Sequence, residues 1–439
     1  MCCPKTIFIS LVFTCTQVQL HAQKAKYADV YTGYNVAIAG ISGNSIHVWS
    51  ASAAPPYPAA GNIALTLHIF SADMHLQEEK KVELGEINSW SIEFQQADSF
   101  YYASIICVSG ITKRLLLKID WYGNVSNISD TPDLWTNAVS LYERNMFYAM
   151  THKNNHLFSV TIENAMIRDS SGEKDIIPLP GENLTPGQVV QKLIIKKENT
   201  STGASAQLIF GSISKRFYNP VIIATNKDLL VSASAQANNA NNNLFLFFAR
   251  LDTNLAGSLA RPVILKSKGI ENEIYPPSDI IQSENKVALI SKGLYKKEMV
   301  KYYPEYQNGI TVQVPHQSGV YTTHSLKITM IDEKNNALKD TIITDQGNNK
   351  NLQWDNLLTL VSGKGIDIFC GRKYAANKNG ITHFSMNEDG NMKEDDMIVD
   401  PRYDYLVAEA KELVKGDVLI PFLYKGKRGL MRLEYRPAE

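Results

Sequence analysis

Short apolar runs separated by polar turns recur along the whole chain, and each run has the length of a β-strand. The stretch 101–125 illustrates the repeating unit: an apolar run at 101–109, a turn, a second apolar run at 115–119, and a polar turn before Val125. Gly123 stands in that second turn, where a tight hairpin requires a positive φ. The pattern predicts consecutive antiparallel strands and gives little support for helices.

The apolar run that precedes the short polar turn recurs seven times, and we interpret it as the third strand of each unit. It occurs at 65–70, 115–119, 157–162, 244–251, 325–331, 382–386 and 430–435. Candidate first strands lie at 35–40, 91–96, 138–143, within 188–209, and at 278–283, 356–361 and 405–410. Four strands in a repeated unit of about 60 residues predict an all-β, seven-bladed β-propeller with four-stranded antiparallel blades.

Both chain ends fit one blade of such a ring. No fourth strand follows 430–435, whereas residues 26–32 precede the first unit without belonging to it. We therefore predict that the N-terminal strand closes the ring by pairing beside 430–435. The stretch 166–240 contains more apolar runs than one blade needs, so an inserted hairpin or an eighth blade is the alternative. Residues 236–243 are predicted to form a polar loop.

The first 22 residues have the pattern of an export signal. Lys5 supplies a basic start, 7–13 form an apolar core too short to cross a bilayer, and Ala22 precedes a plausible cleavage point. The sequence thus predicts a signal peptide at 1–22 and a single propeller domain at 23–439, exported to the periplasm, the outer surface or the medium. Lipid anchoring through Cys15 is disfavoured, because small residues do not precede it.

The net charge gives no reason to expect a nucleic-acid partner, and the cysteine count limits the possible disulfides. The chain carries 44 basic and 44 acidic residues, so nothing in its net charge favours nucleic acid. No transmembrane segment is predicted. After removal of the leader only Cys107 and Cys370 remain, in units far apart around the predicted ring, and we expect two buried thiols. No cofactor or metal motif stands out.

Variable loops point to one face of the predicted propeller. Long insertions follow the second strand of several units, so they emerge on the same side of the ring. Arg372 and Lys373 belong to a set of basic residues in these loops, while acidic residues gather in the short turns. We interpret this face as a binding surface for an anionic glycan or a cell-surface protein. The alternative is that both sets only solvate turns and loops.

Aromatic residues near the starts of the first strands suggest a central funnel. Trp90, Trp135, Trp354 and Tyr405 occupy such positions, and Tyr303 lies in the longest loop, where it would form the rim. Their rings would stack on sugars. The competing interpretation is that these aromatic side chains only pack between neighbouring blades.

Two classes of function remain open on the sequence alone. The first is an exported binding scaffold. The second is a carbohydrate-active hydrolase or lyase with Asp279, Asp355 and Asp404 as candidate carboxylates in the funnel. A hydrolase would need two carboxyl groups about 5 to 10 Å apart, which these three residues would supply if neighbouring blades bring them together.

The polar turn after the third strand has a recognisable sequence motif in two of the units. Asp120-Trp121-Tyr122-Gly123-Asn124 and the segment 388–391, Glu-Asp-Gly-Asn, fit a hydrophobic-Asp-x-x-Gly-Asn ending of a repeat unit. This repeat resembles exported β-propeller proteins of Bacteroidota-type bacteria, most of which have no known function. The resemblance implies a propeller fold and export, and it implies no activity.

Overall fold

The computed structural model describes most of residues 25–437. The wider gaps are 29–33, 53–61, 133–147, 168–175, 238–243, 256–261, 267–272 and 345–350, and shorter gaps interrupt several turns. Within the described residues the fold is all-β, as predicted, and its one helical element is the 3-10 turn η2 (Val407–Glu409). None of these residues forms a helix of the length and apolarity that crossing a bilayer requires.

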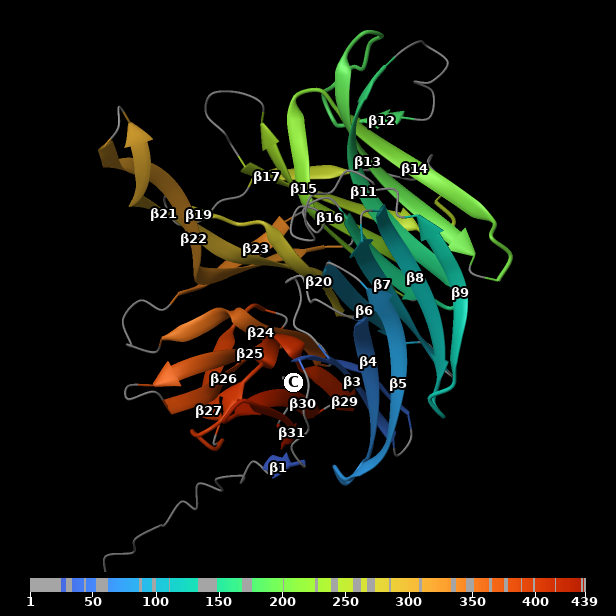
Figure 1. The fold of residues 1–439 in the computed structure, drawn as a ribbon. Coiled ribbons are helices and arrows are strands. Elements are labelled where there is room, and N and C mark those ends of the chain that lie inside the picture. The colour runs from blue at the N-terminus through green and yellow to red at the C-terminus, as the bar shows by residue number, and fades with distance from the viewer. Residues whose placement is uncertain are drawn as a thin grey trace, which may run out of the picture.

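The described strands form seven sheets that follow one another along the chain (Figure 1). The first contains β2 (Tyr34–Ser42), β3 (Ser45–Ala51), β4 (Asn62–Ser71) and β5 (Leu76–Glu86). The second contains β6 (Ser89–Gln96), β7 (Phe100–Ser109), β8 (Ile111–Asp120) and β9 (Val125–Pro132). The third contains β10 (Tyr148–Lys153), β11 (His156–Met166), β13 (Val189–Asn199) and β14 (Ser205–Ser212), with β12 (Ile176–Pro178) parallel to β14.

The remaining sheets repeat this antiparallel order. The fourth contains β15 (Lys215–Ala224), β16 (Asp228–Ala237), β17 (Leu244–Asp252) and β18 (Val263–Lys266). The fifth contains β20 (Pro277–Ser283), β21 (Lys286–Gln307), β22 (Ile310–Ile331) and β23 (Ala337–Thr344), with β19 (Glu273–Ile274) also beside β21. The sixth contains β24 (Leu352–Ser362), β25 (Gly365–Tyr374), β26 (Lys378–Met386) and β27 (Met392–Met397).

The seventh sheet joins the two ends of the chain. It contains β28 (Asp404–Tyr405), β29 (Lys411–Val414), β30 (Asp417–Tyr424), β31 (Lys427–Glu434) and the N-terminal β1 (Ala25–Tyr27). Strand β1 pairs antiparallel with β31, with Ala25 opposite Leu433 and Tyr27 opposite Met431. The ladder continues as the Ala28 amide donates to the Leu430 carbonyl at 2.9 Å. The sequence predicted a strand within 26–32 beside 430–435, and the described strand beside that segment is Ala25–Tyr27, while 29–32 lie outside the described residues.

Turn chemistry explains why the strands stop where they do. After β8 the Gly123 amide donates to the Asp120 carbonyl at 2.9 Å, and Gly123 has a φ of +76°. The Asp120 side chain accepts hydrogen bonds from the backbone amides of Tyr122 and Asn124. An aspartate that holds the backbone and a glycine with positive φ together make a tight turn that returns the chain as β9.

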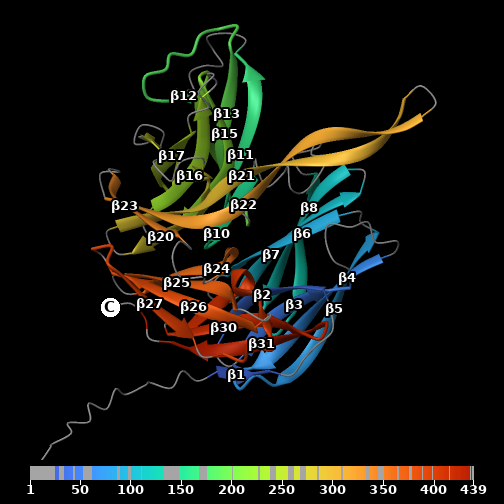
Figure 2. The same ribbon diagram turned by 90° about the vertical axis from the view of Figure 1, so that its left-hand side faces the viewer.

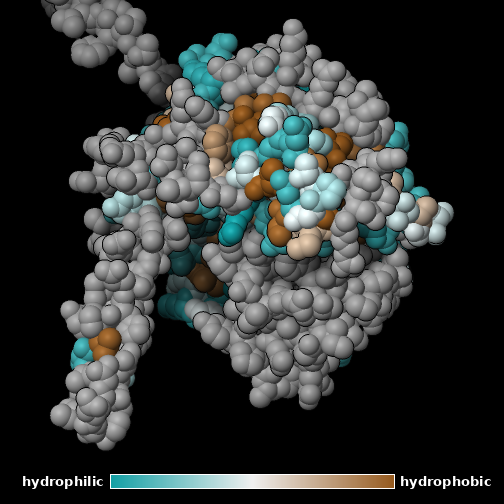
Figure 3. Space-filling view, turned by 90° about the horizontal axis from the view of Figure 1, so that it is seen from above, coloured by the Kyte–Doolittle hydropathy of each residue, from teal (hydrophilic) through white to brown (hydrophobic). Residues whose placement is uncertain are grey.

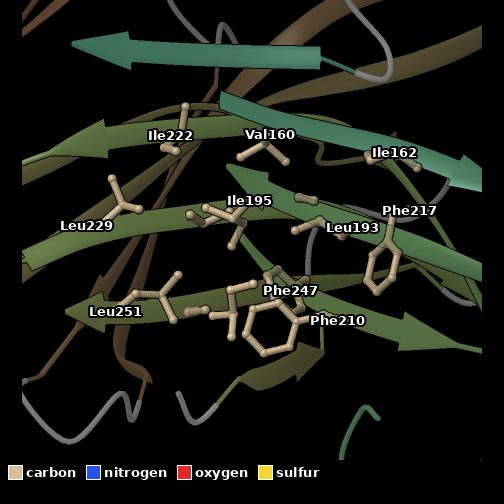
Figure 4. Close-up of a cluster of buried hydrophobic side chains, with 14 of the residues drawn as sticks. Val160, Ile162, Leu193, Ile195, Phe210, Phe217, Ile222, Leu229, Phe247 and Leu251 are labelled. Carbon is tan, nitrogen blue, oxygen red and sulfur yellow. The ribbon is translucent and has the colours of Figure 1, made fainter. Parts of the chain in front are cut away.

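Apolar residues on both faces of the sheets form the core. Between the third and fourth sheets, Val160 and Ile195 lie close to Ile222 and Phe247 (Figure 4). Comparable clusters lie between other consecutive sheets. Their members include Trp49 and Tyr101 (first and second), Phe248 and Leu289 (fourth and fifth), Ile328 and Ile368 (fifth and sixth), Phe369 and Ile420 (sixth and seventh), and Leu430 and Val48 (seventh and first). Each fully buried side chain contributes about 1.5–3 kcal/mol.

Sheets also meet through their first strands. Strand β10 contacts β6 and β15, β20 contacts β15 and β24, and β2 contacts β29 and η2 of the seventh sheet. First strands therefore gather on one side of all the sheets, and the seventh sheet lies against the first.

Two assignments along the third and fourth units are corrected. Residues 157–162 lie in β11, which is the second strand of its sheet, and the third strand is β13. The stretch 188–209, expected to hold a first strand, forms β13 and β14. The surplus of apolar runs at 166–240 is thus shared between the end of the third sheet and the start of the fourth. The expected first strand at 138–143 lies outside the described residues, as does most of the predicted loop 236–243.

The longest predicted loop, 295–323, is instead a β-hairpin arm. Strands β21 and β22 continue past the fifth sheet and stay paired from Gly293–Ser325 to Gln307–Ile310. The arm projects well beyond the body of the molecule (Figure 2). The segment KKEMVKYYPEYQ contains a valine and three tyrosines, residue types that are enriched in strands, so its composition is compatible with a strand as well as with a loop.

A buried carboxylate ties the third sheet to the start of the fourth. The Glu182 side chain accepts hydrogen bonds from Ser212 Oγ and the Ile213 amide, each at 2.9 Å, and from Lys215 Nζ at 3.1 Å. Ser214 Oγ also donates to it. Burial alone would raise the pKa of Glu182, but these hydrogen bonds more than offset it and hold the pKa below its usual value.

Replacing Glu182 with glutamine is expected to lower the free energy of unfolding by about 2 kcal/mol at pH 7, because hydrogen bonds to a charged acceptor are lost. A carboxyl with a depressed pKa stabilises the fold above its unfolded-state pKa and loses this contribution as the pH falls through the folded-state pKa. The difference from wild type should therefore shrink in urea unfolding at pH 3. Glu163→Gln, at an exposed position of β11, is the control, and an equal loss in both variants would contradict the role of Glu182.

Candidate functional site

A pocket of about 580 Å³ lies among the first strands of the fourth, fifth and sixth sheets. Its walls come from the end of β15, the middle of β20 and the end of β24. The lining residues are Ile223, Ala224, Thr225, Asp279, Ile280, Ile281, Gln282, Thr359, Leu360 and Val361. We call this the axial pocket. Mostly apolar walls with a few polar groups and a volume of this size are typical of small-molecule sites.

Asp279 is the ionisable group of the axial pocket. Its carboxylate accepts a hydrogen bond from Thr359 Oγ1 of β24 at 2.6 Å and from the Ile280 amide at 2.8 Å. Burial raises the pKa of Asp279, although these hydrogen bonds and the charge of Lys292 oppose the shift. The carboxyl therefore takes up a proton at a higher pH than an exposed aspartate does, and when protonated it can donate as well as accept.

Gln282 supplies the second polar group. Its side-chain oxygen Oε1 is buried and has no hydrogen-bond partner among the described residues. Buried polar atoms are nearly always paired, because leaving one unpaired costs about 1–3 kcal/mol. Gln282 also lines the axial pocket, so this unpaired acceptor lies beside a space from which a ligand hydroxyl or a water can donate to it.

The other hydroxyl groups of the axial pocket are already engaged. Thr225 Oγ1 donates to the Asp228 carbonyl at 3.0 Å and accepts from the Asp228 amide at 3.0 Å, which fixes the turn after β15. Thr359 is held by Asp279. The groups able to meet a ligand are thus the Asp279 carboxyl and the Gln282 amide, within walls of isoleucine, leucine and valine.

Of the three predicted carboxylates, only Asp279 lies in the axial pocket. Asp355 is exposed and accepts a hydrogen bond from Thr323 Oγ1 of β22 at 2.5 Å. Asp404 is half-buried in β28, beside Leu423 of β30. The three side chains have different neighbours, so the described structure does not assemble the carboxylate pair that a hydrolase would need.

Two of the predicted aromatic binding residues belong to the core. Trp354 is 2% exposed and stacks on Phe384 with ring centroids 6.3 Å apart. Tyr405 is also 2% exposed, and its hydroxyl donates to the Asp400 carbonyl at 2.7 Å. Both rings are packed as the competing interpretation expects, and a role for Trp354 and Tyr405 in binding stays a prediction.

The other predicted binding residues are spread over several sheets. Trp90 is the second residue of β6 and Tyr303 lies in the arm, in β21, while Trp135 lies outside the described residues. Arg372 in β25 is paired, with Nη1 2.6 Å from both carboxylate oxygens of Asp396. Lys373 follows it with an exposed side chain. The described strands that carry Trp90, Tyr303, Arg372 and Lys373 belong to the second, fifth and sixth sheets, and a common binding role stays a prediction. Seen from above, apolar and polar groups alternate over the described surface (Figure 3).

A second group of residues with shifted pKa values lies where the seventh sheet meets the first. Burial raises the pKa of Glu409 in η2 to about 7, against the opposing charge of Arg428, whose Nη1 lies 3.6 Å from Glu409 Oε2. Burial lowers the pKa of Lys411 to about 8, and its Nζ donates to the Ala39 carbonyl of β2 at 2.7 Å. Lys411 thus links the two sheets directly.

Sequence reasoning missed Gln282, Glu409 and Lys411. Gln282 lies within a run that was correctly assigned as a first strand, but nothing in the run marks its oxygen as buried. Glu409 and Lys411 lie in and after a run expected to be a strand, which η2 interrupts. The neighbours that perturb them come from distant parts of the chain, so no local signal was available.

Comparisons with known proteins identify no family. No protein-family model matches the sequence, and no curated protein is significantly similar to it. Among solved structures, a subtype N10 neuraminidase-like protein of A/little yellow-shouldered bat/Guatemala aligns with a TM-score of 0.38 and 10% identity, over 81% of this chain and 99% of that one.

Two other solved structures align over shorter lengths. A mutant of Synechocystis apocarotenoid oxygenase gives a TM-score of 0.32 and 10% identity over 72% of this chain. A GH43 β-1,3-galactosidase gives a TM-score of 0.28 and 7% identity, over 64% of this chain and 55% of that one. This chain covers 65% of the oxygenase, which is less than two thirds of its length. Similarities this weak establish neither a common fold nor a common activity.

Proposed function

We propose that the protein is an exported, seven-bladed β-propeller that binds a small neutral saccharide in the axial pocket. The observation that carries the binding proposal is the buried, unpaired Oε1 of Gln282 in the same apolar-walled pocket as the Asp279 carboxyl. Export is proposed from the leader pattern at 1–22, which lies outside the described residues.

Two observations support a closed ring. The β1–β31 pairing brings the two ends of the chain into one sheet. The apolar cluster that contains Val48 and Leu430, together with the Lys411 hydrogen bond to Ala39, joins the seventh sheet to the first. A ring of this kind places the first strands around the axis, and the axial pocket lies among three of them.

The chemistry of the axial pocket favours a neutral ligand over the anionic glycan that loop charge suggested. Its lining includes a carboxyl, an amide and hydroxyl groups, and it includes no lysine or arginine. An ionised Asp279 would repel an anionic sugar, whereas a hydroxyl can donate to Gln282 Oε1 and can pair with Asp279 in either protonation state. The apolar walls suit the C–H faces of a sugar ring.

Binding is proposed instead of hydrolysis for a geometric reason. Glycoside hydrolysis by the usual route needs two carboxyl groups flanking the scissile bond. Asp279 is the one carboxyl among the described lining residues of the axial pocket, and Asp355 and Asp404 have other surroundings.

Neutral disaccharides such as maltose, cellobiose or lactose are expected to raise the unfolding temperature of the mature protein, because a ligand that binds only the native state stabilises it. Gln282→Leu should weaken binding of the best saccharide about tenfold or more in calorimetric titration, since a ligand hydroxyl loses its acceptor. Gln207→Leu, on the exposed part of β14, is the matched control and should bind as wild type does.

A uronic-acid disaccharide serves as the anionic comparison and should bind more weakly than its neutral counterpart. The proposal fails if no neutral saccharide changes the unfolding temperature of the wild-type protein. It also fails if Gln282→Leu and Gln207→Leu bind the best saccharide equally well.

A further inference from the structure

Three side chains on neighbouring strands of the first sheet are hydrogen-bonded in a line. Ser50 Oγ of β3 lies 2.7 Å from His68 Nε2 of β4, and His68 Nδ1 lies 2.7 Å from Glu79 Oε1 of β5. In the ladder His68 is opposite both Val48 and Glu79, and Ser50 is two residues beyond Val48. The period of two therefore places all three side chains on one face of the sheet.

Burial and charge indicate which of the three side chains donates and which accepts in each hydrogen bond. Ser50 is 4% exposed and His68 is 2% exposed, whereas the Glu79 side chain reaches solvent. Burial lowers the pKa of His68, although Glu79 opposes the shift. The imidazole is thus neutral at pH 7. If Nδ1–H donates to the Glu79 carboxylate, Nε2 must accept from the Ser50 hydroxyl.

We propose that Ser50 is a nucleophile for acyl transfer from small carboxylic esters, with His68 as its general base and Glu79 orienting the imidazole. A nucleophile hydrogen-bonded to a base, and that base to a carboxylate, is the arrangement that activates serine in unrelated folds. This site lies on the first sheet and is independent of the axial pocket, so the saccharide proposal can fail without affecting it.

The chemical steps balance without any added cofactor. Ser50 Oγ attacks the ester carbonyl carbon while its proton moves to His68 Nε2. The ester C–O bond then breaks, and the alcohol departs with the proton from His68. The acyl group remains bound to Ser50 Oγ. Water attacks the acyl-serine by the same route in reverse, so His68 takes a proton from the water and returns it to Ser50 Oγ as the carboxylic acid is released.

The low exposure of Ser50 restricts the acyl donor to a small one, so the test uses a small fluorophosphonate on the full-length mature protein. Intact mass should show one added group, and peptide mapping should place it on Ser50. Glu79→Gln and His68→Gln should slow labelling about tenfold and at least a hundredfold, respectively. Ser232→Ala removes another fully buried serine, whose hydroxyl donates to the Phe247 carbonyl, and should label as wild type does.

The pH dependence separates an activated serine from a structural hydrogen bond. The labelling rate should be constant from pH 7 to 8. It should decrease at pH values below about 6.5, the usual histidine pKa, as His68 becomes protonated. Absence of label on the wild-type protein, under conditions that label a known serine hydrolase, overturns the proposal. Label on Ser50 at the same rate in wild type, Glu79→Gln and His68→Gln overturns it as well. Mapping on wild type does not depend on whether the variants fold.

Discussion

Replacing Asp367 with alanine is expected to lower the free energy of unfolding by about 2–3 kcal/mol, because a buried imidazole would lose the carboxylate to which it is hydrogen-bonded. Asp367 in β25 is fully buried, and its Oδ1 lies 2.7 Å from Nε2 of His383 in β26, which is 4% exposed. The imidazole also stacks on Phe369 at 4.7 Å between ring centroids. Without the carboxylate, a polar ring would remain in an apolar environment between two central strands.

Urea unfolding of the two proteins at the same pH measures this loss. Asp367→Asn retains an oxygen that can accept from the imidazole, and it should cost less than half as much as Asp367→Ala. Asp395→Ala is the surface control, because Asp395 pairs with Lys393 where both side chains are largely exposed, and such pairs contribute about 0–1 kcal/mol. An Asp367→Ala protein within 1 kcal/mol of wild type would show that the pair does not support the sixth sheet.

Much of the strand order could be read from the sequence because turn chemistry and strand periodicity are local. Six of the seven predicted third strands are third strands in the structure, and the turn at 120–124 forms with Gly123 at positive φ. The error at 157–162 has a simple cause. The strand that precedes it, β10, reads YAMTHK and is too short and polar to stand out, so β11 was assigned to the wrong place in its sheet.

The candidate site was only partly predictable because its groups are perturbed by distant neighbours. Asp279 could be predicted because it is a carboxylate near the start of a first strand. Its hydrogen-bond partner Thr359 could not, because it is 80 residues away in the sequence. The sequence alone could not show whether the Trp354 ring packs or binds a ligand, because its position against Phe384 follows from sheet register. Ser50, His68 and Glu79 meet through the register of three strands, which residue spacing alone does not give.

Removing the N-terminal strand is expected to destabilise the seventh sheet more than any single surface change. The Tyr27 ring lies 5.1 Å from that of Tyr403 and 5.7 Å from that of Phe422, and its hydroxyl accepts from the Asp400 amide at 3.2 Å. Ala28 is 8% exposed in the cluster that joins the seventh sheet to the first. A chain that starts at Tyr34 loses these contacts and the β1 ladder, and should unfold at least about 3 kcal/mol more readily than one that starts at Gln23.

Hydrogen exchange locates the effect, because the β31 amides that pair with β1 should lose protection while those of β8 should not. The exposed edge of β31 should also promote association, so the shortened chain is expected to form dimers or larger species as its concentration rises. Tyr27→Phe keeps the ring and the strand and loses only the hydroxyl contacts, so it should cost about 1 kcal/mol and remain monomeric at concentrations where the wild type does. A shortened chain that keeps the wild-type unfolding midpoint and the protection of its β31 amides against exchange would contradict this expectation. That result would show that β1 does not hold the two ends of the chain together, and another contact would have to close the proposed ring.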